Sequence, residues 1–319
     1  MKTIGVLTSG GDAPGMNACI RAIVRTARYF GMEVYGIRRG YYGLVNDDVI
    51  EMHIDSVSDI IQRGGTILYT ARCDEFKTKE GMDKALATVK KYGIEGIIAI
   101  GGDGTFRGAV DLSSHGVPAV GIPGTIDNDL PYTDYTLGFD TAVNTCLNLI
   151  NNLRDTMTSH ERVSIVEVMG RNCGDIALYA GVGGGAEAII IPEVPVNLDD
   201  IIERMRQSRG RGKRSNIIIL AEGAGNAENL AKELREKTGY SIRSTIIGHV
   251  QRGGAPTMAD RILASKFGYH AVELLKNNIG NRAVGIRDNK IVDIDLVQAM
   301  NMKREVDMHM YKMAEILAT

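Results

Sequence analysis

The stretch AIGGDGTFRG (residues 99–108) decides the fold. An apolar run leads into two glycines, an aspartate follows, and the next residues suit a helix. The stretch TSGGDAPGMNA (8–18) repeats this construction after the apolar, β-branched run 3–8. A strand, a glycine turn and a helix in direct succession predict an α/β fold with parallel sheets covered by helices on both faces.

The same alternation continues along most of the chain. Short runs rich in β-branched residues predict strands, and apolar residues spaced three and four apart predict helices. The predicted strands are 3–8, 33–38, a run within 93–102, 117–122, 162–169, 186–193, 216–223 and 242–250. The predicted helices are 16–30, 80–92, 104–114, 138–158, one from 174, one capped by Asn197, 226–237, and 257–275 with Pro256 in its first turn.

Composition excludes several classes of protein. The 319 residues are 44% hydrophobic and 24% charged, and the net charge of −2 gives no general attraction to nucleic acid. The cysteines show neither a zinc-ligand spacing nor a disulfide framework, so reduced thiols in the cytoplasm are expected; they are Cys19, Cys73, Cys146 and Cys173. We expect no signal peptide and no membrane span.

Both glycine turns are candidate phosphate sites. Glycines allow backbone N–H groups to approach an anion, and a helix N-terminus adds partial positive charge. A plain tight turn is the alternative. Neither turn is a Walker A box or a dinucleotide fingerprint. The second turn adds Asp103, whose carboxylate would repel phosphate unless a cation lay between them. This favours a Mg²⁺ role for Asp103, and a helix N-cap is the alternative.

The stretch PGTIDND (123–129) places two acids at the end of a buried strand. No basic residue lies between Arg107 and Arg154 to neutralise them. If this strand neighbours the GGDGT strand, Asp127 and Asp129 join Asp103 at one edge of the sheet. Like charges there indicate a metal site or a proton-transfer role. A loop stabilised by Asp and Asn side chains is the alternative.

Basic residues supply possible counter-charge. Arginines 21, 25 and 28 lie on the polar side of the first helix, and RGRGKR (209–214) forms a basic loop; a solvated surface explains both. Other arginines lie in loops near strand ends, where they suit phosphorylated ligands; they are Arg72, Arg171 and Arg252. We interpret His249, close to Arg252, as a hydrogen-bonding partner for phosphate or sugar.

The motifs together resemble a known family. GVLTSGGDAPGMNA, RGGTILYTARC, IGGDGT, PGTIDND, VMGRNCGD, AEG and GHVQRGG occur in the order seen in bacterial ATP-dependent 6-phosphofructokinases, over nearly the whole chain. The resemblance implies two doubly wound three-layer α/β/α domains with mostly parallel sheets. The ATP-binding domain would hold 1–138 and about 251–301. The sugar-phosphate and effector domain would hold 139–250 and about 302–319.

The resemblance also implies roles for individual residues. ATP would contact Gly11, Tyr41, Arg72, Cys73 and Gly102, Asp103, Gly104 and Thr105, with Asp103 on Mg²⁺. Asp127 would be the base for the sugar 1-hydroxyl, and Thr125 and Arg171 would stabilise the transferring phosphoryl group. Fructose 6-phosphate would lie in the cleft, held by Thr125, Asp127, Met169, Gly170, Arg171, Glu222, His249 and Arg252, with Arg162 and Arg243 lent by a neighbouring subunit of a homotetramer.

The basic patches gain a second interpretation from the same resemblance. An effector site for ADP or GDP as activator and phosphoenolpyruvate as inhibitor would use Arg21, Arg25, Arg154, Gly185, Glu187, Arg211 and Lys213. Pyrophosphate-dependent relatives usually carry Asp and Lys where this chain has Gly104 and Gly124, so the glycines favour ATP. An NAD- or lipid-kinase-like enzyme, a pyrophosphate-dependent enzyme and a non-catalytic sensor stay open as alternatives.

Overall fold

The computed structural model describes residues 1–213 and 215–318, which form two compact units. Unit 1 consists of Met1–Ile126, Leu130–Thr141 and Arg252–Arg304, and unit 2 of Asp127–Asp129, Ala142–Gln251 and the chain from Glu305 onward. The chain therefore passes between the units several times. The structural division assigns the acidic triplet 127–129 to unit 2, whereas the predicted division counted it with the first domain.

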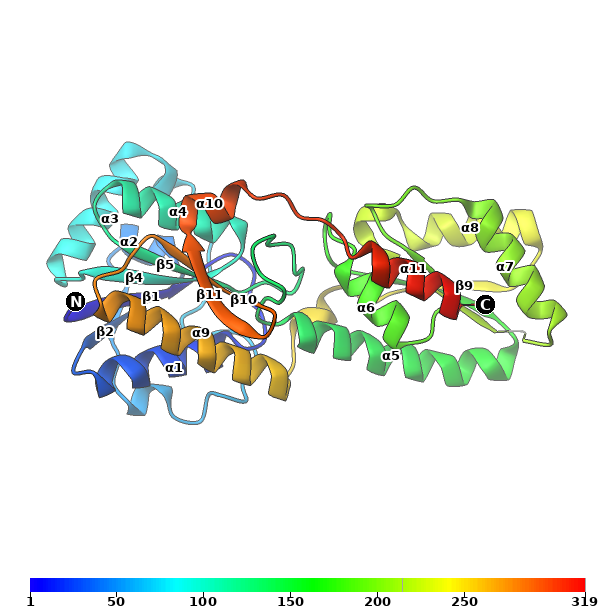
Figure 1. The fold of residues 1–319 in the computed structure, drawn as a ribbon, viewed down its shortest axis with the longest axis horizontal. Coiled ribbons are helices and arrows are strands. Elements are labelled where there is room, and N and C mark those ends of the chain that lie inside the picture. The colour runs from blue at the N-terminus through cyan, green and yellow to red at the C-terminus, as the bar shows by residue number, and fades with distance from the viewer. Residues whose placement is uncertain (214, 319) are drawn as a thin grey trace. The chain divides into compact units, whose positions relative to one another are not determined.

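Unit 1 is built on a seven-stranded sheet with the order β11-β10-β5-β4-β1-β2-β3 (Figure 1). Its strands are β1 (Thr3–Thr8), β2 (Glu33–Ile37), β3 (Val49–Glu51), β4 (Gly96–Gly101), β5 (Ala119–Pro123), β10 (Arg282–Arg287) and β11 (Lys290–Asp295). The five central strands run parallel, and β3 and β11 are antiparallel edge strands. Because β4 pairs with β5, the GGDGT strand neighbours the PGTIDND strand, so the condition for a shared edge of the sheet is met.

Helices lie on both faces of this sheet. In Figure 1, α1 and α9 pack together on one face, while α2, α3, α4 and α10 lie on the other. The helices are α1 (Met16–Tyr29), α2 (Tyr41–Val45), α3 (Lys79–Lys91), α4 (Asp103–Ser114), α9 (Met258–Lys276) and α10 (Leu296–Asn301). Helix α9 begins one residue later than expected, because the Thr257 side chain accepts from the amide of Asp260 and is the N-cap; Pro256 precedes the helix.

Unit 2 contains a four-stranded parallel sheet with the order β7-β8-β6-β9. Its strands are β6 (Val163–Val168), β7 (Ala188–Ile190), β8 (Asn216–Ala221) and β9 (Ile242–Ile246). Its helices are α5 (Phe139–His160), which begins in unit 1, α6 (Asp175–Gly183), α7 (Leu198–Gly210), α8 (Ala227–Thr238) and α11 (Met308–Leu317). The predicted Asn197 cap is confirmed, since its side chain accepts from the amide of Asp199.

The α/β fold class is confirmed, with mostly parallel sheets in both units. Several predicted strands were too long, two of them by four residues or more. The run 242–250 ends as a strand at Ile246, because Gly248 takes a positive φ of 59° and the chain turns into a 3₁₀ helix, Gly248–Arg252. The run 186–193 forms a strand over Ala188–Ile190 alone. Among the helices that the structure describes, none is both long and apolar enough to cross a membrane.

Candidate active site

The two glycine turns of unit 1 lie against each other at the carboxyl ends of β1 and β4. The amide of Ser9 donates to the carbonyl of Ile100 at 3.1 Å, and the buried Thr105 hydroxyl donates to the carbonyl of Ser9 at 3.1 Å. A Cβ on Gly101 would overlap the Ser9 carbonyl oxygen, so this approach requires glycine. The sheet edge thus combines two backbone turns with the N-terminus of α4, which suits an anion.

Asp103 is the first residue of α4 and is half-exposed. Gly102 is the N-cap, so the alternative role of Asp103 as a capping residue is wrong. Its carboxylate pairs with Arg107 at 2.9 Å, one turn further along the helix. Within residues 1–213 and 215–318, no group of three or more His, Cys, Asp or Glu side chains is arranged to hold a metal ion. One accessible carboxylate fits a Mg²⁺ ion that brings phosphate and water as its other ligands.

Tyr41 supports the GGDGT turn from inside the core. Its hydroxyl donates to the carbonyl of Thr105, and its ring stacks on Phe76 with centroids 4.3 Å apart. A Cβ on Gly108 would lie 2.5 Å from the ring, so α4 can pack here because residue 108 is glycine. Burial raises the pKa of the Tyr41 hydroxyl, and the nearby Asp111 raises it further. Of the other predicted ATP contacts, Arg72 is exposed and Cys73 is half-buried.

Arg252 lies over the first glycine turn. Its Nη2 donates to the carbonyl of Asp12 at 2.9 Å, and its Nε lies 3.7 Å from the Asp12 carboxylate. A Cβ on Gly11 would overlap the guanidinium. The structure therefore brings Gly11 and Arg252 together within unit 1. Asp12 was not among the predicted site residues, although its place inside the GGDAPG turn could have indicated it.

The two glycines that bear on the phosphoryl donor have different surroundings. A Cβ on Gly104 would meet no atom within 4 Å. A Cβ on Gly124 would lie 3.0 Å from Ile100 Cγ2 and 3.1 Å from Met16 Cε, which is tighter than ordinary packing. Position 104 can therefore take a side chain without rearrangement, and position 124 cannot. Thr125 follows Gly124, and its backbone carbonyl accepts a hydrogen bond from the Thr136 hydroxyl at 2.6 Å.

In unit 2, Asp127 has its counter-charge on a distant part of the sequence. Its side chain is 2% exposed, and its Oδ2 lies 3.4 Å from Nε of Arg171, which follows the carboxyl end of β6. The neighbouring Asn128 has a positive φ of 52° and donates to the buried carboxylate of Asp175, the first residue of α6, at 2.8 Å. The loop is thus held by α6 while Asp127 meets a guanidinium.

Glu222 shapes the loop that carries Arg171. Its Oε1 accepts the amide of Gly170 at 3.2 Å and that of Arg171 at 2.8 Å. Both residues have positive φ, 136° and 53°, so the loop needs such an anchor. A Cβ on Gly223 would overlap the Arg171 carbonyl, which keeps the two strand ends close. Glu222 therefore positions the loop through two backbone amides.

Gln251 is a further residue of this region that the sequence did not single out. It is fully buried in the 3₁₀ helix, and its Oε1 accepts the amide of Met169 at 3.1 Å. His249, two residues earlier, is exposed. The place of Gln251 inside the HVQRGG motif could have indicated its role, because a buried side-chain amide needs specific hydrogen-bond partners.

Arg162 and Arg243 lie at the other edge of the sheet of unit 2. Arg162 precedes β6, and Arg243 pairs with Ser164 near the start of that strand. Met169 and Arg171 follow the end of β6. At about 3.3 Å per residue, the six residues of β6 separate the two edges by roughly 17 Å. The structure therefore does not bring these arginines together with Asp127 and Arg171 within one chain.

Four predicted effector residues meet in unit 2. Arg154 Nη2 donates to the carbonyls of Gly184 and Gly185, and Lys213 Nζ pairs with the buried carboxylate of Glu187. Arg211 is the exposed C-cap of α7. The remaining two, Arg21 and Arg25, lie on α1 in unit 1.

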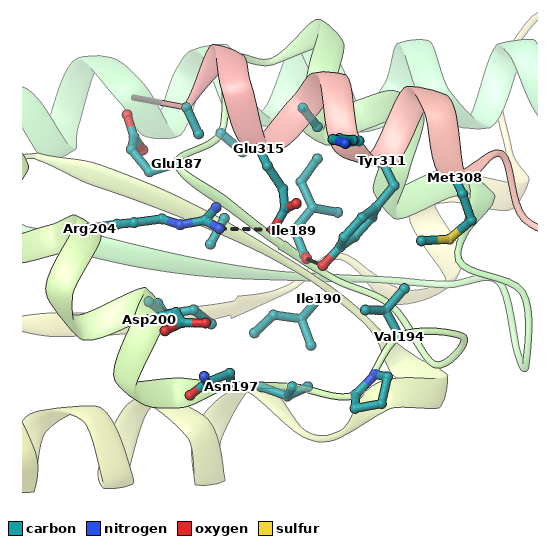
Figure 2. A pocket seen from close by; sticks show the side chains of 18 residues that line it. Glu187, Ile189, Ile190, Val194, Asn197, Asp200, Arg204, Met308, Tyr311 and Glu315 are labelled. Carbon is teal, nitrogen blue, oxygen red and sulfur yellow. Dashed lines mark hydrogen bonds and ion pairs between the residues drawn. The ribbon is translucent and has the colours of Figure 1, made fainter.

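A cavity of about 420 Å³ lies beside this cluster, between β7, α7 and α11 (Figure 2). Ile189 and Ile190 line its floor, and Arg204 pairs across it with Glu315 at 2.9 Å. Tyr311 donates to the carbonyl of Ile189 at 3.4 Å. Glu187 lines one end, so the cavity adjoins the predicted effector residues.

Comparison with known proteins identifies the class. A family model described as phosphofructokinase matches residues 3–275. ATP-dependent 6-phosphofructokinases from Clostridioides difficile and Clostridium botulinum are each 59% identical over 318 residues, covering 100% of this chain and 100% of theirs. The chain therefore belongs to the phosphofructokinase family. It is an enzyme, a phosphotransferase with an alcohol group as acceptor, and the resemblance to the bacterial ATP-dependent 6-phosphofructokinases is confirmed.

Solved structures agree with this assignment. Phosphofructokinase from Saccharomyces cerevisiae superposes with a TM-score of 0.90 at 34% identity, over 100% of this chain and 48% of the yeast chain. The chain thus spans about half the length of the yeast protein. A pyrophosphate-dependent phosphofructokinase from Marinobacter aquaeolei, 24% identical, covers 97% of this chain and 86% of its own with a TM-score of 0.86, and shares the fold.

Proposed function

We propose that this chain transfers the γ-phosphoryl group of ATP to the 1-hydroxyl of fructose 6-phosphate, giving fructose 1,6-bisphosphate and ADP in glycolysis. The observation that carries the proposal is the buried Asp127 carboxylate with Arg171 at 3.4 Å. A proton acceptor next to a cation is what phosphoryl transfer to an alcohol requires. The relatives named as ATP-dependent 6-phosphofructokinases support the choice of both substrates.

The step needs a base and neutralisation of charge. Asp127 takes the proton of the 1-hydroxyl as its oxygen forms a bond to the γ-phosphorus, and the bond from that phosphorus to the bridging oxygen of ADP breaks. Arg171 offsets negative charge on the transferring group, together with Thr125. Glu222 holds the amides of Gly170 and Arg171 and so keeps the guanidinium in place.

The nucleotide belongs to unit 1 in this proposal. Backbone N–H groups of the two glycine turns and the N-terminus of α4 bind its phosphates. The exposed Arg72, which directly precedes Cys73, adds a positive charge. Asp103 would hold Mg²⁺ directly or through water. The ion supplies charge neutralisation of the phosphate oxygens when bound. In unit 2, the sugar phosphate contacts Met169, Gly170, Glu222 and His249.

Arg162 and Arg243 act in a neighbouring subunit. The roughly 17 Å between the edges of the sheet exceeds the reach of an arginine side chain, so these residues cannot serve their own chain's Asp127 loop. A homotetramer with active sites shared between subunits accounts for the place of both arginines at the edge of the sheet away from Asp127. We propose that the protein acts in the cytoplasm as this tetramer.

The cluster of Arg154, Gly185, Glu187 and Lys213 is proposed as part of an effector site, with Arg211 and, from α1, Arg21 and Arg25. ADP or GDP would activate there and phosphoenolpyruvate would inhibit. The support is the meeting of basic side chains and a buried carboxylate around the positive-φ Gly185. Such a site binds anions without a role in the transfer step.

The acceptor tests the proposal. ADP release is measured with ATP, Mg²⁺ and fructose 6-phosphate, and again with NAD or a diacylglycerol in its place. Of the three acceptors, we expect only fructose 6-phosphate to cause ADP release. Its product should carry a phosphate at both ends of the sugar. Release only with NAD or lipid would replace the proposal by the kinase alternatives. Binding of both ligands without ADP release would indicate a sensor.

A further inference from the structure

Gln251 joins two loops of unit 2 that are far apart in the sequence. Its Oε1 accepts the amide of Met169, 82 residues earlier, at 3.1 Å, and its Nε2 donates to the carbonyl of Gly248 at 3.1 Å. The first loop continues into Gly170 and Arg171, and the second carries His249. One side chain therefore spans the two loops to which the proposed function assigns the sugar phosphate.

The surroundings of Gln251 leave its amide little freedom. The residue is 0% exposed, and Oε1 also accepts the thiol of Cys146, on α5, at 3.2 Å. Burial raises the pKa of that thiol to about 12, so it keeps its proton and acts as a donor. Two donors on the oxygen and one acceptor on the nitrogen define which way the amide points. A buried amide with its partners in place rigidifies its surroundings.

The same loop is held a second time, from the other side. Glu222 accepts the amides of Gly170 and Arg171, the two residues directly after Met169. Three successive amides are thus bound by two side chains, one from the end of β8 and one from the 3₁₀ helix after β9. Because Gly170 and Arg171 have positive φ, the path of the loop depends on these anchors.

We propose that Gln251 is a positioning residue for the acceptor sugar phosphate: it aligns the Met169–Arg171 loop with the His249 loop before the substrate arrives. This inference rests on the proposed function, since it takes fructose 6-phosphate as the ligand of these loops. Gln251 itself does not take part in the transfer. Its loss misplaces residues that contact the sugar phosphate and leaves the glycine turns of unit 1 unchanged.

The test substitutes Gln251→Met, which keeps the length of the side chain and removes all three of its hydrogen bonds. We expect the KM for fructose 6-phosphate to rise about 10-fold, while the KM for ATP changes by less than about 2-fold. Cys146→Ala is the matched control, because it removes the other donor to the same oxygen without touching either loop. We expect it to lower the melting temperature without moving either KM.

A second measurement does not require turnover. Hydrogen exchange of the peptide containing the Met169 amide should be faster in Gln251→Met than in wild type, and unchanged in Cys146→Ala. If Gln251→Met fails to fold, Gln251→Asn, one methylene shorter, is measured in the same way. Unchanged KM values and exchange in a folded variant would overturn the inference, as would an equal rise of the sugar KM in Cys146→Ala.

Failure of the proposed function would look different. In that case wild type itself would release no ADP with fructose 6-phosphate, whatever residue stands at position 251. An active wild type with an insensitive Gln251→Met leaves the function standing and removes only the positioning role.

Discussion

The carboxyl edges of the two sheets are built from different chemical groups. In unit 1 the edge is backbone: two glycine turns and a helix N-terminus, with Gly101 touching the Ser9 carbonyl so closely that no Cβ fits. In unit 2 the edge consists of side chains. Asp127 pairs with Arg171, and the side chains of Glu222 and Gln251 accept backbone amides of the loop that carries Arg171. Backbone amides suit any polyphosphate, whereas placed side chains select one acceptor.

This difference predicts where single substitutions should act. In unit 2, removing one side-chain functional group should lower the rate of the transfer step. In unit 1, the binding groups are main-chain atoms, so new side chains should matter more than lost ones.

The largest effect should come from Asp127→Ser in unit 2. Loss of the proposed base should lower kcat by about 10²–10⁴-fold, because a general base typically contributes that much. The KM for fructose 6-phosphate should change much less. Steady-state kinetics measure both, and Asp155→Ser, at an exposed acid on α5, is the control. Near-normal turnover in Asp127→Ser would remove the carboxylate from the mechanism.

Unit 1 should respond to an added charge. Gly104→Asp fits sterically, since a Cβ there meets nothing within 4 Å, but it places a second carboxylate beside Asp103. Repulsion of the nucleotide phosphates should raise the KM for ATP about 10-fold and leave that for fructose 6-phosphate unchanged. Gly104→Asn, of the same shape without charge, should raise it far less. Equal effects of the two variants would contradict an electrostatic origin.

Asp260 is a buried acid of unit 1 with a structural role. It accepts the amides of Gly138 and Thr141, both at 2.9 Å, and burial raises its pKa above the ordinary value of 3.8. Asp260→Asn leaves one of these amides facing an NH₂ group and should cost about 1–3 kcal/mol of unfolding free energy. Turnover at saturating substrates should change little, in contrast to Asp127→Ser.

The pH dependence of Asp260→Asn has a defined sign. Because the folded pKa is raised, the unfolded chain releases this proton more readily. Wild type therefore gains stability relative to the variant as the pH falls through the folded pKa toward 3.8, and loses that gain as the pH rises. Denaturant unfolding at several pH values measures the difference. A gap between the two proteins that narrows toward low pH would contradict burial of the charge as the cause.

The smallest effect on turnover should come from Lys213→Ala. This variant removes the ion-pair partner of Glu187 in the proposed effector site, so inhibition by phosphoenolpyruvate and activation by ADP should weaken. Maximal turnover should change by less than about 2-fold, as the cluster has no part in the transfer step. Lys232→Ala, at an exposed lysine of α8, is the control. Unchanged effector responses would show that Lys213 is only a solvated surface residue with no part in effector binding.

The regular parts of the fold were predictable because they depend on local patterns. The apolar run of β1 and the Asn197 cap of α7 are readable from neighbouring residues. The pairing of Asp127 with Arg171 is not readable from neighbouring residues, since Arg171 lies 44 residues away and meets Asp127 only through the β6 loop; the family resemblance alone placed both residues in one site. Gln251 was missed for the same reason. Tyr41 shows a further limit: sequence marks the residue, but only packing reveals it as a buried support.

The donor specificity of the wild-type enzyme tests the central claim most directly. Initial rates are measured with saturating fructose 6-phosphate and Mg²⁺, once with ATP and once with pyrophosphate, under otherwise identical conditions. We expect rapid formation of fructose 1,6-bisphosphate and ADP with ATP, and negligible product with pyrophosphate. Faster turnover with pyrophosphate, or none with ATP, would contradict it.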